Sequence, residues 1–521
     1  MKRRPNILFL MADQLAAPVL PLYGHKLVKT PNLERLAAQG TVFENSYCNS
    51  PICASSRFSM MSGQLPTQIG AYDNAAEFPA SIPTFAHYLR ELGYATCLSG
   101  KMHFVGPDQL HGFEDRVTTD IYPSDFGWTP DWTQGKYPYA PSQMSMRGVV
   151  EAGLCTRSLQ IDYDEDVANQ AIQRLYDHAR GKSEKPFLLV SSFTHPHNPF
   201  TTTRRFWDLY RHDDIDMPAV PFIPFEARDA WSKRYYYLIR QDEHRVTDEM
   251  VRTARHAYYG MTSYVDHQVG RVLEVLNETG LAENTVVVFT ADHGDMLGER
   301  GMWYKFNPFE WSVRVPLVIK APGAPGGRRA HPNVSLVDLL PTLLDLATDG
   351  QAPELADRID GTSLANEIHG ASSALPDEAL VEFAAEGVSA PAFILRKGRF
   401  KYVYCETDPG MMFDLEGDPN ELRNIAQDPA HGARAEAMKK EIVERCRPQQ
   451  VREQVLASQR RRLFVQRALA RGRPAPWDFQ VIQDASRQYV RSMNNPDTTA
   501  TKSKARLPYV TPAPPDFPRA E

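Results

Sequence analysis

The chain has 521 residues, a formal net charge of −6 at pH 7 and 42% hydrophobic residues. This length allows one large domain with smaller additions. The acidic balance and the lack of a basic block argue against nucleic acid as a partner. No apolar stretch approaches the length that a membrane-spanning helix needs, so we expect no membrane insertion.

The N-terminal segment, MKRRPNILFLMADQ, places basic residues before an apolar run. The run is short, is followed by Asp13 and has no small-residue cleavage site, which favours a first β-strand over a secretory signal. The cysteines are sparse and scattered, as expected of reduced thiols. They are Cys48, Cys53, Cys97, Cys155, Cys405 and Cys446. We therefore expect a cytoplasmic protein.

In chain order, apolar runs alternate with amphipathic segments. Residues 6–11 form a continuous apolar run, which predicts a strand buried on both faces. A helix follows, with Thr30 as N-cap, Pro31 at its first position and Gly40 as its stop. The remaining predicted elements are a short strand at 42–43, a helix at 82–92, strands at 94–98, 187–193 and 285–290, a long helix at 251–276, and sheet and helix elements at 313–319 and 336–346. This alternation is typical of an α/β sandwich with a mostly parallel sheet.

Three regions depart from this rhythm. Residues 105–155 are rich in Pro, Gly, Trp and Tyr and predict a loop-rich functional region within a main domain at 1–380. Strands at 392–395 and 400–405, followed by a turn-rich segment, predict a smaller antiparallel subdomain at 381–448. Residues 449–521 start helical and end in an aromatic, Pro-rich tail that we expect to be extended.

The stretch 50–63, SPICASSRFSMMSG, places Cys53 at the predicted start of a helix and Arg57 one turn later. A helix N-terminus offers unpaired N–H groups and the positive end of the helix dipole, which suits a nucleophile that attacks an anionic ester. Arg57 could hold both the nucleophile and an oxyanion. The residues alone leave open a buried structural cysteine before an ordinary helix.

Polar side chains follow several of the predicted strands. Asp13 and Gln14 follow the first strand, and Asp292 and His293 follow a later one. Because the carboxyl ends of parallel strands share one edge of a sheet, these side chains should converge. Two carboxylates, an amide oxygen and an imidazole suit Ca²⁺, Mg²⁺ or Mn²⁺. Asp13 alone would more simply be a helix-capping residue.

Basic side chains follow the predicted strands in the same way. Lys101 and His103 end one strand, His197 follows another, and Lys305 lies soon after the second pair of metal-ligand candidates. Taken singly, each has an ordinary explanation as a surface lysine or a core histidine. Their shared position favours one basic site at the same edge of the sheet.

The segment Cys53-Ala54-Ser55-Ser56-Arg57 resembles the sulfatase signature Cys-x-Pro-x-Arg, in which a separate maturing enzyme oxidises the cysteine to formylglycine. Ser55 stands where the signature usually has Pro or Ala. Segments at 72–77, 99–103, 105–113, 118–123 and 294–301 resemble choline sulfatases in particular, and the likeness covers nearly the whole chain. It implies an alkaline-phosphatase-like α/β sandwich: a large mixed, mostly parallel sheet flanked by helices, with a smaller C-terminal antiparallel sheet.

The resemblance also implies a reaction, in which hydrated formylglycine at position 53 attacks the sulfur of a small alkyl sulfate ester, most simply choline sulfate. A divalent metal, Ca²⁺ or Mn²⁺ before Mg²⁺, is expected on Asp13, Gln14, Asp292 and His293. The implied catalytic residues are Cys53, Arg57, Lys101, His103, His197 and Lys305. Of these, Arg57, Lys101 and Lys305 would orient the sulfate. His197 or Lys305 would protonate the leaving alcohol, and His103 would be the base of the second step. The neighbouring His195 and Asp295 match nothing and are expected to be structural.

A quaternary ammonium cannot donate hydrogen bonds and is recognised by aromatic faces and carboxylates, with cation–π contacts of about 0.5 to 2 kcal/mol each. The resemblance points to Trp128, Glu386 and Asp497 for this role. It also implies a homo-oligomer, a dimer or tetramer with exchange of C-terminal tails. Between Tyr137 and Arg147 this chain lacks a histidine that choline sulfatases tend to have, which leaves open a reshaped pocket or another small alkyl sulfate.

Two other functions remain open from the sequence. A phosphonate monoester or phosphodiester hydrolase would share the fold, the formylglycine and the Asp-His metal pair. A non-catalytic protein that binds sulfate esters would result if Ser55 prevented conversion of Cys53.

Overall fold

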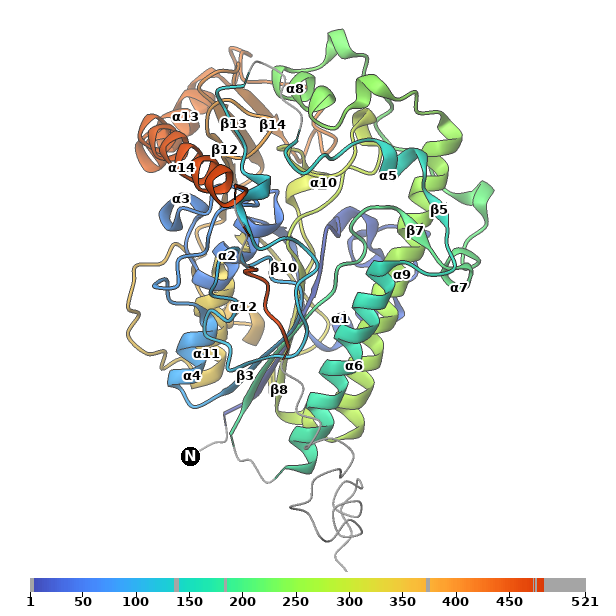
Figure 1. Cartoon of the computed structure of the whole chain (residues 1–521), viewed down its shortest axis with the longest axis vertical. Helices are drawn as coiled ribbons and strands as arrows, with labels where there is room; N and C mark the ends of the chain where they lie inside the picture. Colours follow the sequence, from blue (N-terminus) through green and yellow to red (C-terminus); the bar gives the residue numbers. More distant parts are fainter. Residues whose placement is uncertain are drawn as a thin grey trace, which may run out of the picture.

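The computed structural model describes residues 4–134, 140–181, 185–371, 375–471, 473 and 476–481. Figure 1 shows a large twisted sheet between two layers of helices, with a second, smaller sheet above it. The fold class predicted from the sequence is therefore confirmed.

The central sheet has eight strands in the order β10-β2-β9-β8-β1-β6-β3-β4. Only β9 runs antiparallel to its neighbours, β2 and β8. The central strand β1 pairs with β6 and β8 and is buried along its whole length, which explains its uninterrupted apolar sequence. The strands are β1 (Asn6–Ala12), β2 (Thr41–Tyr47), β3 (Ala95–Gly100), β4 (Asp115–Arg116), β6 (Phe187–Ser192), β8 (Thr285–Ala291), β9 (Leu317–Lys320) and β10 (Arg328–Ser335).

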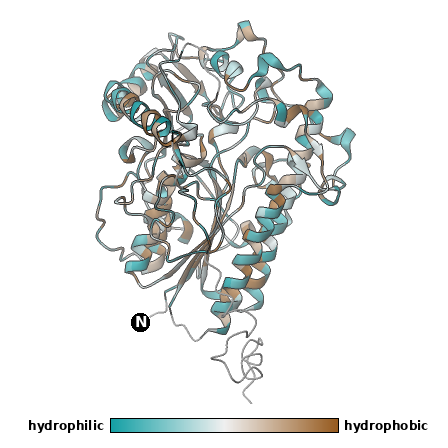
Figure 2. Cartoon of the chain, in the orientation of Figure 1, coloured by the Kyte–Doolittle hydropathy of each residue, from teal (hydrophilic) through white to brown (hydrophobic). Residues whose placement is uncertain are grey.

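Helices cover both faces of this sheet. The long helices α6 (Leu159–Arg180) and α9 (Asp248–Glu278) pack together on one side, with α1 (Pro31–Gln39) against α9. On the other side lie α2 (Cys53–Ser62), α4 (Phe85–Glu91) and α11 (Leu339–Thr348) (Figure 1). Figure 2 shows α6 and α9 striped with hydrophobic and hydrophilic residues, as expected of helices that bury one face.

Short elements connect these layers at the carboxyl end of the sheet. They are α3 (Pro66–Ile69), η3 (Phe126–Trp128), α5 (Arg147–Val150), β5 (Gly153–Leu154), β7 (Thr201–Thr202), α7 (Arg204–Trp207), α8 (Ala230–Leu238) and α10 (Glu310–Val313). Helix α12 (Ala365–His369) lies at the opposite end of the sheet, where the following Gly370 approaches Arg328 at the start of β10.

The second sheet is antiparallel, in the order β11-β12-β13-β14. Its strands are β11 (Glu378–Phe383), β12 (Ala392–Lys397), β13 (Phe400–Cys405) and β14 (Met411–Asp414). Helix α13 (Gly432–Cys446) packs on it, and α14 (Pro448–Leu469) follows. The buried Lys401 of β13 joins this sheet to the main domain, because its Nζ donates to the carbonyl oxygen of Pro308 at 2.8 Å and to Glu310 at 3.0 Å.

The structure differs from the sequence-based elements at several places. The helix predicted at 82–92 begins at Phe85, because the Thr84 side chain accepts a hydrogen bond from the His87 N–H and caps it. Val313 is the last residue of α10, and the strand within the predicted segment 313–319 begins only at Leu317. Helix α6 and strand β10 were not predicted. The division at residue 380 stays a prediction, and β11 begins close to it, at Glu378.

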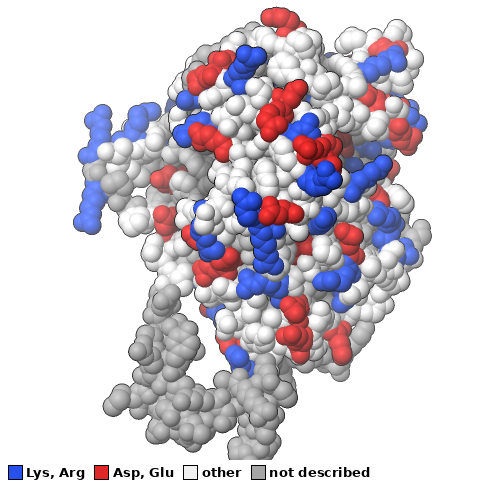
Figure 3. Space-filling model, turned by 90° about the vertical axis from the view of Figure 1, so that its right-hand side faces the viewer, with Lys and Arg blue, Asp and Glu red and all other residues white. Residues whose placement is uncertain are grey.

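Charges of both signs are interspersed over the face shown in Figure 3. Among the described residues, the search for a helix long and apolar enough to span a membrane finds none.

Candidate active site

The predicted site residues converge at the carboxyl edge of the central sheet. Each follows one of four neighbouring strands, β8, β1, β6 and β3, or opens α2. The residues that meet there are Asp13, Gln14, Cys53, Arg57, Lys101, His103, His197, Asp292, His293 and Lys305.

Cys53 is the first residue of α2 and is 1% exposed. Its Sγ lies 3.2 Å from His293 Nε2, 3.5 Å from Lys305 Nζ and 3.9 Å from Asp13 Oδ1. The next backbone N–H, that of Ala54, donates to the side-chain oxygen of Asn74 at 3.0 Å. The cysteine therefore lies among charged groups at a helix N-terminus and not within the apolar core.

Four side chains around this point form a potential metal site. Asp13, Cys53, Asp292 and His293 are buried, and one ligand atom from each lies within 4.8 Å of the others. The amide oxygen of Gln14 is nearby, where it accepts from Lys305 Nζ at 2.6 Å. Two buried carboxylates so close together need positive charge between or beside them. The donor set of carboxylates, an amide oxygen and an imidazole fits a divalent cation.

Buried cations balance these carboxylates. Arg57 Nε donates to Asp292 at 2.8 Å, and Lys101 forms an ion pair with Asp13. Burial alone would raise the pKa of Asp292, but Arg57 and His293 lower it to about 2. Burial likewise opposes ionisation of Cys53, yet Lys101 and Lys305 lower its pKa well below the ordinary value. The site thus favours anionic groups at position 53 and at the carboxylates.

Three cationic side chains, those of Arg57, Lys101 and Lys305, surround the space next to Cys53 and Asp13. Arg57 Nη1 donates to the Lys101 carbonyl at 2.7 Å and to Ser192 Oγ at 2.9 Å, which fixes the guanidinium. Its Nη2 is buried and has no hydrogen-bond partner among the described residues, while Asp13 Oδ2 lies 3.8 Å away. With Lys305 beside Cys53, these groups can orient an anion at the end of α2.

His197 and Lys305 form a hydrogen-bonded pair. His197 Nδ1 lies 2.7 Å from the backbone oxygen of Asn198, an acceptor, so Nδ1 carries the proton. Nε2 is then an acceptor for Lys305 Nζ at 2.7 Å. Burial, and then the charge of Lys305, lower the pKa of His197, which keeps the imidazole neutral. The Tyr122 hydroxyl lies 3.0 and 3.2 Å from the two ring nitrogens.

His103 is held in a left-handed backbone conformation, with φ 61°, at the end of β3. Its backbone N–H donates to Asp120 at 2.8 Å, and its ring stacks on Tyr122 at 5.3 Å between centroids. Both ring nitrogens are buried without hydrogen-bond partners among the described residues. This histidine therefore has free proton-accepting capacity beside the site.

A cavity of about 360 Å³ opens onto these groups. The nucleophile position and the basic side chains form one part of it, and Trp128 and Tyr122, with ring centroids 5.4 Å apart, form an aromatic wall. The lining comprises Cys53, Asn74, His103, Tyr122, Trp128, Ser142, Gln143, Met144, Ser145, Arg147, Gly148, Glu151, His197, Asn198, Pro199, Lys305 and Phe306. The cavity thus joins an anion site to an aromatic surface.

The other two predicted substrate-binding residues are Glu386 and Asp497. Glu386 is outside the cavity lining but is buried, and its Oε2 has no hydrogen-bond partner among the described residues. Its pKa is raised to about 8, chiefly by burial and also by the charge of Asp73, while Lys305 opposes the rise. Asp497 lies outside the described residues.

The two neighbours that were expected to be structural make contacts of that kind. His195 Nδ1 is 2.7 Å from Asp164 Oδ2. Asp295 accepts from the Gln14 amide at 2.6 Å and from the backbone N–H of Leu297 and Tyr304, so it orients Gln14.

Comparison with known proteins agrees with this geometry. The family model described as Sulfatase matches residues 5–349. The chain belongs to the sulfatase family. Two further models match, "Choline sulfatase enzyme C terminal" at 453–506 and "N-sulphoglucosamine sulphohydrolase, C-terminal" at 298–448.

Individual relatives cover most of the chain. It is 44% identical to a choline-sulfatase of Rhizobium meliloti, over 95% of this chain and 97% of that protein. It is 28% identical to an arylsulfatase of Clostridium perfringens, over 84% and 94% of the two chains. The structure of a phosphonate monoester hydrolase of Agrobacterium radiobacter superposes with a TM-score of 0.68 at 24% identity, over 87% and 96%, which shows a shared fold.

Membership of the family makes this protein a sulfuric ester hydrolase. It also implies formylglycine at the signature cysteine, Cys53, and a divalent metal. The ligand cluster described above fits that metal.

Among the lining residues that were assigned no role from the sequence, Asn74 and Tyr122 contact predicted catalytic groups or the backbone beside them. Asn74 caps the backbone beside Cys53, and Tyr122 contacts both His103 and His197. Both follow an aspartate, Asp73 or Asp120, whose carboxylate accepts backbone N–H groups and shapes the loop. An Asp followed within two residues by a polar or aromatic side chain was the available sequence signal, but it is common in loops.

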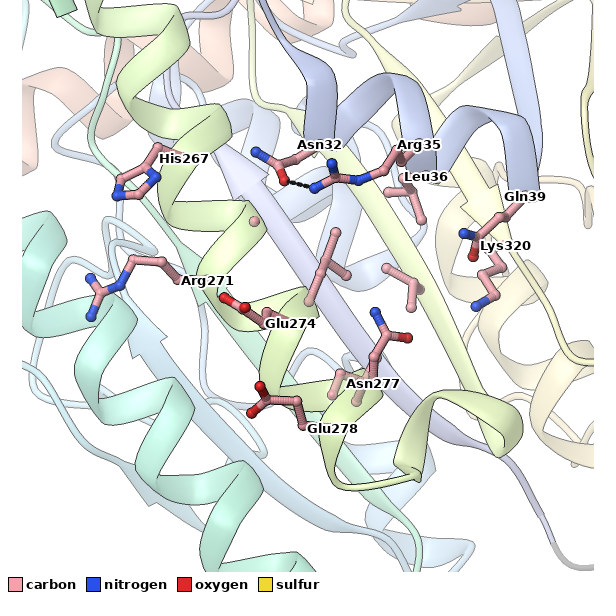
Figure 4. Close-up of a pocket in the computed structure, with 14 residues that line it drawn as sticks. Asn32, Arg35, Leu36, Gln39, His267, Arg271, Glu274, Asn277, Glu278 and Lys320 are labelled. Atoms are coloured by element: carbon pink, nitrogen blue, oxygen red, sulfur yellow. Dashed lines mark hydrogen bonds between the residues drawn. The ribbon is translucent and has the colours of Figure 1, made fainter.

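A larger hollow, of about 490 Å³, lies between α1 and the second half of α9 (Figure 4). Cations such as Arg35 and Arg271 alternate there with Glu274 and Glu278. It lies next to Lys320, at the end of the antiparallel strand β9, and shares no lining residue with the cavity at Cys53.

Proposed function

We propose that the protein hydrolyses choline sulfate to choline and inorganic sulfate. The observation that carries the proposal is a single cavity with an anion site at Cys53 and an aromatic wall of Trp128 and Tyr122. The 44% identity to a choline-sulfatase supports it. The fold likeness to a phosphonate monoester hydrolase bears on architecture alone.

Arg57, Lys101 and Lys305 bind and orient the sulfate group in this proposal. All three are buried, so their charges act with little screening by water. Hydrated formylglycine at position 53 supplies the attacking hydroxyl. Asp13, Gln14, Asp292 and His293 would hold a divalent metal, which would make that hydroxyl more acidic, and their mixed oxygen and nitrogen ligands would favour Ca²⁺ or Mn²⁺ over Mg²⁺.

The hydrogen bonds around His197 support Lys305, of the two candidates, as the proton donor. Because His197 Nδ1–H points to a backbone oxygen, Nε2 accepts from Lys305 Nζ. Lys305 therefore carries the proton that the leaving alkoxide needs, and His197 holds the ammonium in place. His103, whose ring nitrogens have no hydrogen-bond partner among the described residues, serves as the base of the second step.

The choline end is recognised by the aromatic wall and by Glu386. A trimethylammonium group gains from the faces of Trp128 and Tyr122, each contact being worth about 0.5 to 2 kcal/mol. Within the part of the chain that the structure describes, the buried Glu386 has no hydrogen-bond partner for Oε2, so a cation would offset the cost of its burial. Asp497 is proposed to join them from the C-terminal tail of a neighbouring subunit.

The proposal also covers the maturing enzyme, the oligomeric state and the cellular location of the protein. A maturing enzyme converts Cys53 within a signature that carries Ser55. The protein forms a homo-oligomer, a dimer or tetramer with exchanged tails, and the packing of Trp477 against Phe126 at 5.2 Å supports a role for the tail near the substrate loop. A cytoplasmic location is favoured because all six cysteines are free.

The deciding experiment is turnover of choline sulfate by the purified, metal-loaded protein, followed by sulfate release, with the Cys53→Ala variant as control. We expect rapid release by the wild type and none above background by the variant. Turnover of another alkyl sulfate with none of choline sulfate would overturn the choline assignment and leave the sulfatase assignment intact.

A further inference from the structure

Helix α14 places a buried arginine against the loop beside the nucleophile. Arg462 Nη1 and Nη2 donate to the two oxygens of Asp73 at 2.6 and 2.7 Å, although 389 positions separate the residues. Arg462 is 6% exposed and Asp73 is fully buried. The next residue, Asn74, lines the cavity and accepts the Ala54 N–H at the start of α2. One ion pair thus joins the C-terminal helix to the loop that caps the nucleophile helix.

The same face of α14 contacts the substrate loop. Arg462 Nη1 also lies 3.4 Å from Thr129 Oγ1, and Thr129 directly follows Trp128. Helix α14 packs on η3, the turn that contains Trp128, and Figure 1 shows the end of α14 meeting this loop. The turn that carries Trp128, one residue of the aromatic wall, therefore packs on the helix that carries Arg462.

A third connection reaches Glu386. Gln459, one turn before Arg462 on α14, accepts the backbone N–H of Trp132 at 3.1 Å. The Trp132 indole N–H donates to the carbonyl oxygen of Ala385 at 2.9 Å, and Ala385 precedes Glu386. Arg462 and Gln459 thus contact the loop of Asn74 and the loop of Trp128 directly, and they reach the segment of Glu386 through Trp132.

We propose that Arg462 is a positioning residue for substrate recognition: its pair with Asp73 and its contact with Thr129 fix Asn74 and Trp128 relative to Cys53. The inference rests on the proposed function, since it concerns the same cavity. A planar guanidinium suits this role because it bonds both oxygens of one carboxylate and still reaches a third group, which an ammonium cannot do with the same geometry.

The charge of Arg462 has a second consequence. Asp73 lies close enough to Glu386 to raise the pKa of that carboxyl group. Removing Arg462 would leave Asp73 as an unpaired buried charge, which would both loosen the loop and disfavour the ionised form of Glu386. Both effects act on the recognition of a cation more than on the attack at sulfur.

The test compares two substrates that differ only in charge, choline sulfate and its uncharged carbon isostere 3,3-dimethylbutyl sulfate. For Arg462→Met we expect the preference for choline sulfate, taken from the ratio of kcat/KM values, to fall at least about tenfold, mainly through KM; a 1 Å displacement can cost ~10²-fold. Arg462→Lys keeps the charge without the planar fork and should recover part of the preference. Arg460→Met, at an exposed position of the same helix, should leave kcat/KM unchanged for both substrates.

Hydrogen exchange followed by mass spectrometry supplies a readout that needs no substrate. Peptides that cover residues 72–76 and 126–133 should exchange faster in Arg462→Met, while β1 and β8 should not change. The double variant Asp73→Asn with Arg462→Met, which leaves no unpaired charge, shows whether a loss of folding in the single variant is a charge effect. Unchanged exchange in these loops, or an unchanged substrate preference, would overturn the inference. If the wild-type protein does not hydrolyse choline sulfate, the proposed function is refuted. The hydrogen-exchange data would still decide whether Arg462 positions the two loops.

Discussion

The Glu386→Gln variant tests how the cationic end of the substrate is recognised. Glu386 is buried, and its Oε2 has no hydrogen-bond partner among the described residues. Burial raises the pKa of this carboxyl group from 4.5 to about 8. Below pH 8 the group is mostly protonated in the free enzyme, and above pH 8 it is mostly ionised.

The pKa sets the expected size of the effect. The difference between 4.5 and about 8, at ~1.4 kcal/mol per pH unit, means that ionised Glu386 costs about 5 kcal/mol in the empty pocket. A trimethylammonium group about 4 Å away would return ~4 kcal/mol at an effective dielectric constant near 20. Glutamine offers no such charge, so at high pH, where the native carboxylate is ionised, we expect KM for choline sulfate to rise by up to ~10³-fold, the equivalent of ~4 kcal/mol.

The sign of the pH dependence of KM follows from the raised pKa of Glu386. Because a cation binds the ionised form, KM of the wild type should fall about tenfold per pH unit as pH rises towards 8 and then level off. The assay is KM for choline sulfate from about pH 6 to about pH 9.5, in which range the substrate itself does not titrate. The matched control is 3,3-dimethylbutyl sulfate, whose KM should lack this dependence. A Glu386→Gln variant that keeps the pH dependence, or that loses both substrates equally, would refute the reasoning.

Four further outcomes are expected. Intact mass should show Cys53 converted to formylglycine, about 18 Da lighter than cysteine when unhydrated, and Cys53→Ala should abolish turnover; unconverted cysteine in active protein would contradict this. Lys305→Met should lower kcat by ~10²-fold to 10⁴-fold for choline sulfate but far less for 4-nitrophenyl sulfate, whose leaving group needs no proton; equal losses would exclude Lys305 as the acid. Chelation should remove activity and lower Tm, and Ca²⁺ or Mn²⁺ should restore both better than Mg²⁺; full activity in the metal-free protein would contradict the site. Truncation before Trp477 should break the oligomer and impair choline sulfate turnover, which light scattering and kinetics on the same sample would check.

Much of the site could be predicted because the physics of a parallel sheet is local and repetitive. The central strands β1, β6 and β8 are recognisable as apolar runs, and the residues just beyond β1 and β8 had to meet at one edge. Asp13 and Asp292, which lie 279 positions apart, could thus be placed together without any structure.

Other parts lacked such a signal. Helix α6 buries Val167, Ala171 and Leu175 among acidic residues, with Asp164 also buried, so its apolar stripe is thin. Tyr122 lies in a loop with no periodicity that could place it beside His197. The pair of Asp73 and Arg462 depends on how the C-terminal helix crosses the main domain, which no local pattern encodes.

The distribution of charge explains why recognition must lie away from the sulfate. Arg57, Lys101 and Lys305 meet two carboxylates at the base of the cavity, and a divalent metal on those carboxylates adds positive charge. Such a base attracts any small tetrahedral ester anion, because electrostatic attraction over these distances depends little on the group attached beyond the ester oxygen. In the proposed function, discrimination therefore falls to the wall of Trp128 and Tyr122 and to Glu386, where an alkyl chain with a cation gains what a neutral chain cannot. Because α14 packs on the turn that contains Trp128 and is linked through Trp132 to the segment before Glu386, we expect this C-terminal helix to contribute to specificity.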